Sequence, residues 1–189
     1  MPDVPDTRRH HGDTNDHLAF RATRGSAAYD AISALPVAVV LDSIRSLYNV
    51  GSFFRTADAV RVDRLWLCGI TGTPSNPRLA KTALGAETTQ AWSAGEVGDV
   101  LQGLRTGGHE IALVETHPRA VDLFDWKPRF PVAVVFGNEV DGVSPAARDQ
   151  ADTFVRLPML GTKHSVNVAT AGGVVLYELL RKYREAWSR

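Results

Sequence analysis

The chain has 189 residues, and its 21 Lys and Arg balance its 21 Asp and Glu. This length fits one domain, and a hydrophobic content of 44% with 22% charged residues is typical of a globular protein. A neutral chain is not a bulk polycation that coats nucleic acid, although a local basic patch is not excluded. No apolar run approaches the roughly 20 residues of a membrane-spanning helix, and Cys68 has no partner for an internal disulfide. We therefore expect a cytoplasmic, single-domain protein.

The composition divides the chain into two parts. Residues 1–30 are predicted to form a flexible polar arm, and residues 31–189 the folded domain. The arm contains His10 and His11 but no third ligand at metal-binding spacing, so we expect no metal site there.

Beyond the arm, apolar runs alternate with helical patterns. Strands are predicted over 36–42, 65–70, 88–92, 110–115, 131–137 and 154–158. Helices are predicted over 51–60, 77–84, 97–104 and 166–183. Continuous β-branched runs are typical of strands buried on both faces, and their alternation with helices predicts an α/β fold with a mostly parallel sheet.

Familiar ligand-binding loops are absent from the sequence. It contains no G-x-G-x-x-G dinucleotide fingerprint, no G-x-x-x-x-G-K-[ST] phosphate loop and no G-x-S-x-G nucleophile elbow. The remaining candidate sites lie at the carboxyl ends of the predicted strands, where open α/β sheets bind ligands.

The first candidate motif, Asn49-x-Gly51-x-x-x-Arg55, follows the strand at 36–42. Gly51 permits close approach of another backbone, and Arg55 offers a forked, permanently charged donor suited to phosphate. The same spacing also suits a helix-capping asparagine and a surface arginine, so the motif alone leaves both interpretations open.

Two more motifs follow later strands. Gly137-x-Glu139-x-x-Gly142 predicts a tight loop that carries an aimed carboxylate, and Ser165 and Asn167 stand at a predicted helix start with free backbone N–H groups. A solvated turn and an ordinary helix cap are the plain alternatives. The three motifs together, each at a strand end, indicate one site.

Three segments carry a family resemblance: LDSIRSLYNVGSFFRTADA, VVFGNEVDGVS and VRLPMLGTKHSVNVATA. They resemble, in order, the three motifs of the SpoU (TrmH-like) RNA 2′-O-ribose methyltransferases. The resemblance implies a SPOUT-type, mostly parallel sheet flanked by helices, with a deep trefoil knot near the C-terminus. It also implies a homodimer that binds S-adenosylmethionine at the knot, needs no metal and methylates RNA. We expect tRNA before rRNA, because a compact domain can dock on a small folded RNA. The alternative is a non-catalytic knotted RNA-binding or assembly factor that binds the cofactor without turnover.

The resemblance also implies roles for individual residues. The catalytic or supporting group comprises Arg55, Asn49, Glu139, Ser165 and Asn167. The group expected to line the adenosyl pocket comprises Thr116, Gly137, Leu157, Met159 and Val166, the last standing where the family more often has Leu. The cations expected to hold RNA are Arg45, Arg55, Arg78, Lys81 and Lys163. A guanidinium rarely loses its proton, so Arg55 is expected to hold the neighbouring phosphate and stabilise the developing alkoxide.

Overall fold

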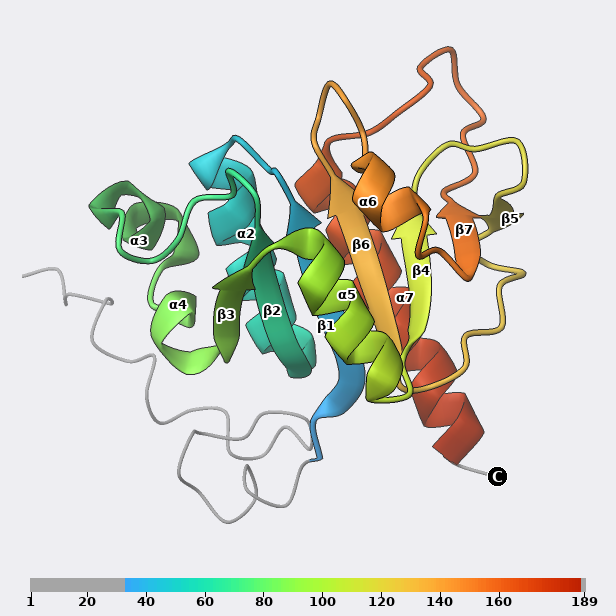
Figure 1. Ribbon diagram of the computed structural model, residues 1–189, viewed down its shortest axis with the longest axis horizontal. Helices are drawn as coiled ribbons and strands as arrows, with labels where there is room; N and C mark the ends of the chain where they lie inside the picture. Colours follow the sequence, from blue (N-terminus) through green and yellow to red (C-terminus); the bar gives the residue numbers. More distant parts are fainter. Residues whose placement is uncertain (1–32, 188–189) are drawn as a thin grey trace, which may run out of the picture. The chain divides into compact units, whose positions relative to one another are not determined.

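The computed structural model describes residues 33–187, so the predicted arm over 1–30 lies outside the described residues. From Leu35 onward the described chain forms one compact unit built on a single sheet (Figure 1). The strands are β1 (Leu35–Asp42), β2 (Val62–Cys68), β3 (Trp92–Gly95), β4 (Glu110–Val114), β5 (Val121–Asp122), β6 (Val132–Gly137) and β7 (Thr153–Arg156). Their order is β3-β2-β1-β6-β4-β7-β5, and every neighbouring pair runs parallel. The predicted α/β class with a mostly parallel sheet is confirmed.

Helices cover both faces of this sheet (Figure 1). They are α2 (Leu47–Val60), α3 (Pro77–Ala83), α4 (Ala86–Thr89), α5 (Val97–Thr106), α6 (Pro145–Arg148) and α7 (Val168–Trp187). Successive residues of β1 enter two separate cores, as the pleat of a strand requires. Val39 joins the core under α2 and α7, whereas Val40 joins the core under α5 and α6. Burial on both faces explains why β1 and β6 are continuous Val-rich runs.

A close helix crossing fixes α7 against α2. A Cβ atom at Gly172 of α7 would lie 2.2 Å from Cε1 of Phe53, so only glycine fits there. The Phe53 ring packs in turn on Phe136 of β6, with ring centroids 4.9 Å apart. This crossing brings the start of α7 next to the start of α2, although the two helices are far apart in sequence.

Some predicted boundaries are wrong. The segment predicted as a strand over 88–92 begins instead with helix α4, and β3 starts at Trp92. The hydroxyls of Thr88 and Thr89 donate to the carbonyls of Gly85 and Ala86, which supports a helical turn that β-branched residues alone do not suggest.

Helix starts and the shortest strand also differ from the predictions. Helix α2 begins four residues before the predicted Gly51 because the Ser46 hydroxyl accepts the N–H of Asn49 and caps it. Helix α7 begins at Val168 rather than at Val166. The two-residue strand β5 is not predicted from the sequence.

Candidate functional site

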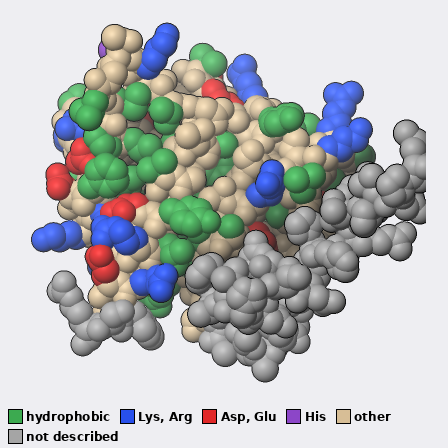
Figure 2. All heavy atoms as spheres, turned by 180° about the vertical axis from the view of Figure 1, so that it is seen from behind, with side chains coloured by type: hydrophobic (Ala, Val, Ile, Leu, Met, Phe, Trp, Pro, Cys, Tyr) green, Lys and Arg blue, Asp and Glu red, His purple; other side chains and the backbone are tan. Residues whose placement is uncertain are grey.

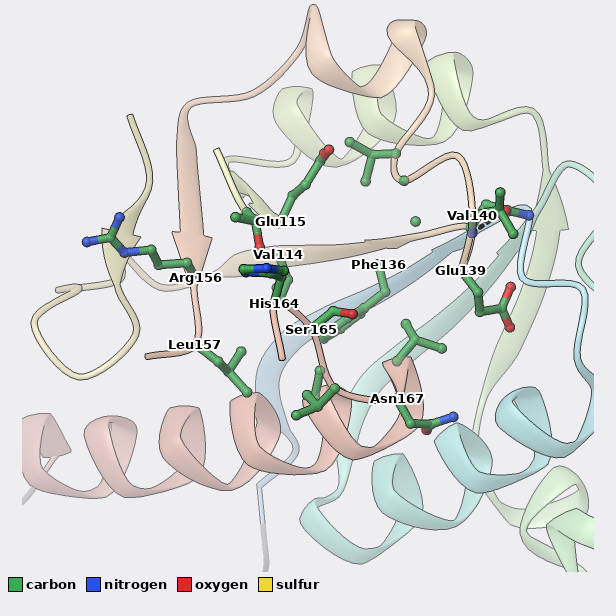
Figure 3. Close-up of a pocket in the computed structure, with 18 of the residues that line it drawn as sticks. Val114, Glu115, Phe136, Glu139, Val140, Arg156, Leu157, His164, Ser165 and Asn167 are labelled. Carbon is green, nitrogen blue, oxygen red and sulfur yellow. Dashed lines mark hydrogen bonds between the residues drawn. The ribbon is translucent and has the colours of Figure 1, made fainter. Parts of the chain in front are cut away.

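The three sequence motifs meet in a network of hydrogen bonds. Asn49, near the start of α2, donates from Nδ2 to Glu139 Oε1 over 2.8 Å, and Asn167 donates from Nδ2 to Asn49 Oδ1 over 3.0 Å. The Asn167 side chain also caps α7, because its Oδ1 accepts the N–H groups of Ala169 and Thr170. Glu139 and Asn167 come from different elements, yet both lie at one side of the same cavity (Figure 3).

Glu139 is held in its ionised form. Burial by itself raises the pKa of this carboxyl, but hydrogen bonds outweigh that effect and lower the pKa below its usual value. The donors are its own backbone N–H, the Asn49 side chain and the backbone N–H groups of Arg45 and Ser46, at the entry to α2. A carboxylate with a lowered pKa is a weak base, so its chemistry here is to accept hydrogen bonds and orient its neighbours.

A cavity of about 620 Å³ opens at the carboxyl ends of β4, β6 and β7 (Figure 3). All five residues predicted for the adenosyl pocket line it: Thr116, Gly137, Leu157, Met159 and Val166. Glu139, Ser165 and Asn167 line it as well. Its size is that of an ordinary small-molecule site, which spans about 300–1,000 Å³.

One wall of the cavity depends on two glycines. The chain folds back sharply after β6, and the N–H and C=O of Asn138 both bond to Gly142 over 2.9 Å. A Cβ atom at Gly137 would lie 2.2 Å from the Gly142 carbonyl carbon and from the Val143 nitrogen. Gly142 has φ +71°, which favours glycine. The predicted tight loop that carries Glu139 is therefore present.

Arg55 is not brought into this cavity. It lies six residues after Asn49, about 1.7 helical turns, and so faces another side of α2. Its exposed side chain lines a separate hollow with Asp58, Leu84, Gly85 and other residues of the α3–α4 connection. The structure thus unites four of the five predicted catalytic residues and separates the fifth within one chain.

Sequence reasoning missed an ion pair beside the cavity. Glu115 follows β4 and lines the cavity, and its Oε1 accepts from Arg148 Nη2 of α6 over 2.6 Å. Figure 3 shows the Glu115 side chain on the side of the cavity away from Asn167. No spacing signal links positions 33 residues apart, so no sequence pattern indicates this pair. Among residues 33–187 there is no cluster of His, Cys, Asp or Glu arranged to hold a metal, and no helix apolar and long enough to cross a membrane.

Comparison with known proteins places this geometry in a family. The chain is 32% identical over 163 residues to the 23S rRNA (uridine(2479)-2′-O)-methyltransferase of Streptomyces viridochromogenes, and the match covers 81% of this chain and 57% of that relative. The chain thus spans a little over half of that relative's length.

Two solved structures share the fold. An AdoMet-bound rRNA methyltransferase from Sinorhizobium meliloti superposes with a TM-score of 0.72 at 26% identity, over 79% of this chain and 60% of the other. The A. aeolicus TrmH/SpoU tRNA modifying enzyme gives a TM-score of 0.72 at 26% identity, over 80% and 77%. Residues 36–177, from β1 into α7, match the sequence profile of the SpoU rRNA Methylase family. The chain therefore belongs to the SpoU rRNA Methylase family.

Proposed function

We propose that this protein transfers a methyl group from S-adenosylmethionine to a ribose 2′-hydroxyl of RNA. The observation that carries the proposal is the Asn49–Glu139–Asn167 network beside a cavity lined by every residue expected to contact the adenosyl group. Its relatives include enzymes named for rRNA and for tRNA. We take tRNA as the first substrate to test and rRNA as the second, with equal support for each.

The residues around the cavity fit the cofactor. Leu157, Met159 and Val166 offer apolar surface for an adenine ring, and Gly137 lets the backbone of the 138–142 loop fold close against the end of β6 to form the opposite wall. When bound, the cofactor supplies a methyl group already activated on a sulfonium, so no metal is required. The chain's own residues bind and orient: Glu139 stays ionised and accepts hydrogen bonds, and Ser165 presents its hydroxyl at the cavity wall.

A homodimer would account for the distance of Arg55 from the cavity of its own chain. Because Arg55 lies outside the cavity of its own chain, the proposed site is completed by the Arg55 of a second copy, which holds the RNA phosphate and stabilises the developing alkoxide. Apolar side chains around the three motifs support a covered surface, since Tyr48, Val140 and Leu160 are 74%, 81% and 99% exposed. Green patches on the rear face in Figure 2 show that apolar side chains also reach the surface there.

We also propose that the chain forms the trefoil knot expected from the family resemblance. Its support is the family and the strand order, in which β6 inserts between β1 and β4 before the chain returns through β7 to α7. Stretching single molecules by their ends tests it: a knotted chain reaches a shorter final length than a fully extended one.

The proposed activity is tested with labelled S-adenosylmethionine and RNA from a methylation-poor source, separated by size. Label in one RNA class is expected with the wild type and is lost with Arg55→Ala. Arg129→Ala serves as the matched control, because Arg129 is exposed and lines neither the cavity nor the hollow. Calorimetry with the cofactor alone runs in parallel. Cofactor binding without label in any RNA would favour the non-catalytic binding factor instead.

A further inference from the structure

A buried amide fixes the loop that carries Glu139. Asn138 is 7% exposed, and it uses both ends of its side chain. Its Oδ1 accepts the N–H groups of Val140 at 2.9 Å and Asp141 at 3.1 Å, which closes the turn. Its Nδ2 donates to the carbonyl oxygen of Ser43 over 2.8 Å. One side chain therefore shapes the loop after β6 and ties it to the segment between β1 and α2.

The end of β1 is arranged to receive this loop. Ser43 has φ +62°, an uncommon conformation for a residue with a side chain, and its carbonyl oxygen is the acceptor for Asn138. The preceding Asp42 is 2% exposed, and its Oδ2 accepts the N–H of Ser144 over 2.7 Å. Two neighbouring residues thus hold both ends of the 138–144 loop, across 95 and 102 positions of sequence.

The same loop serves the candidate site in two ways. Residues 138–142 form one wall of the cavity, and the Glu139 carboxylate accepts hydrogen bonds from Asn49 and from the backbone at Arg45 and Ser46. Asn138 directly precedes Glu139, and Ser43 lies two residues before Arg45. The Asn138–Ser43 bond therefore joins the two segments right next to the contacts of the Glu139 carboxylate. A shift of Asn138 relative to Ser43 therefore displaces Glu139 and the cavity wall together.

We propose that Asn138 is a positioning residue: it sets the register between the 138–142 loop and the entry to α2, and through it the place of Glu139 and the cofactor cavity. The catalytic meaning of this assignment rests on the proposed function, whereas the register itself does not. Asn138 touches no reacting atom in this assignment, and it acts through Glu139.

Asn138→Asp tests the assignment with almost no change in shape. The variant keeps the oxygen that accepts from Val140 and Asp141 but replaces the donor to Ser43 with a second oxygen. We expect binding of S-adenosylmethionine, measured by calorimetry near neutral pH, to weaken about tenfold because one donor is lost and a buried acceptor is left unpaired. As the pH falls, the introduced carboxyl gains a proton that can be donated to the Ser43 carbonyl, so affinity is expected to recover.

The matched control is Asn76→Asp. Asn76 caps α3 with its Oδ1, which accepts the Arg78 N–H over 3.0 Å, so aspartate satisfies the same bond. We expect unchanged affinity at every pH in this control. A double variant with Glu139→Gln adds a second readout, because the losses in kcat are expected to be non-additive if Asn138 acts through Glu139.

Hydrogen exchange separates this inference from the proposed function. In Asn138→Asp the amides of Arg45 and Ser46, which donate to Glu139, are expected to exchange faster than in the wild type, whether or not the wild type binds cofactor or methylates RNA. Unchanged exchange and affinity would overturn the assignment. An affinity loss without recovery at low pH would also overturn it, since the loss would then not arise from the missing donor to Ser43. A variant that fails to fold at any pH would overturn it as well, since Asn138 would then be a residue of general stability.

Discussion

Replacing Gly172 by alanine tests how closely α2 and α7 must approach. The new Cβ atom would lie 2.2 Å from Cε1 and 2.6 Å from Cζ of Phe53, whereas carbon atoms normally stay about 3.5 Å apart. Phe53 is buried against Phe136 and cannot swing away. Overpacking of this kind costs about 1–3 kcal/mol, and an overlap of this size belongs at the upper end. Alanine has a helix propensity about 1 kcal/mol more favourable than that of glycine, so the free energy of unfolding is expected to fall by about 2 kcal/mol in all.

Gly173 supplies the matched control in the next position of the same helix. A Cβ atom there would meet nothing within 4 Å, so Gly173→Ala gains helix propensity without a clash. For a domain of this size, about 2–4 °C of Tm corresponds to 1 kcal/mol. In thermal melts, the Tm is therefore expected to fall by about 4–8 °C for Gly172→Ala and to rise by about 2–4 °C for Gly173→Ala. A Gly172→Ala variant that melts at or above the wild-type temperature would refute the close crossing.

Three further outcomes are expected. Mixing Arg55→Ala chains with Glu139→Gln chains is expected to restore about a quarter of wild-type methylation. Random pairing makes half of the dimers heterodimers, and in each of these one of the two sites has both an intact Glu139 and an intact Arg55. No recovery would place Arg55 in the site of its own chain. Gly137→Ala is expected to abolish calorimetric cofactor binding, because the Cβ atom meets backbone at Gly142, whereas Gly103→Ala, with open space around it, keeps binding. Folding lowers the pKa of Glu139, so just below the usual value of 4.5 the unfolded state binds more protons than the folded state. The stability that this carboxylate contributes is therefore present above pH 4.5 and is lost as the pH falls through the pKa of the folded state. Melts of Glu139→Gln against pH are expected to lack this contribution and to meet the wild-type curve in acid; parallel curves would contradict it.

The sequence predicted what depends on local pattern. Runs of β-branched residues located the buried strands, because a strand covered on both faces has no polar positions. The motifs predicted that Asn49, Glu139 and Asn167 belong together, since parallel strands end at one edge of the sheet. Their hydrogen bonds bear out the proximity. The chemical roles of these residues stay predictions.

What the sequence could not predict depends on contacts between distant segments. The bond from Asn138 to Ser43 spans 95 positions, and no periodicity encodes it. The position of Arg55 outside the cavity follows from the rotation of α2, whose buried face carries Phe53, Phe54 and Ala57 and leaves Arg55 exposed beside the α3–α4 connection. The two threonines of α4 favoured a strand by propensity, yet their hydroxyls stabilise a helical turn through bonds to nearby carbonyls.

The bond between Asn49 and Asn167 also determines when the site can form during biosynthesis. These residues are 118 positions apart, and Asn167 is held by α7, the last helix of the described chain. The ribosome delivers the chain from its N-terminal end at about 5–20 residues per second, so the strands and the first two motifs emerge before α7 exists. A nascent chain therefore carries the first two motifs before the third is available, and the hydrogen bond from Asn167 to Asn49 can form only after this late part of the chain has been synthesised.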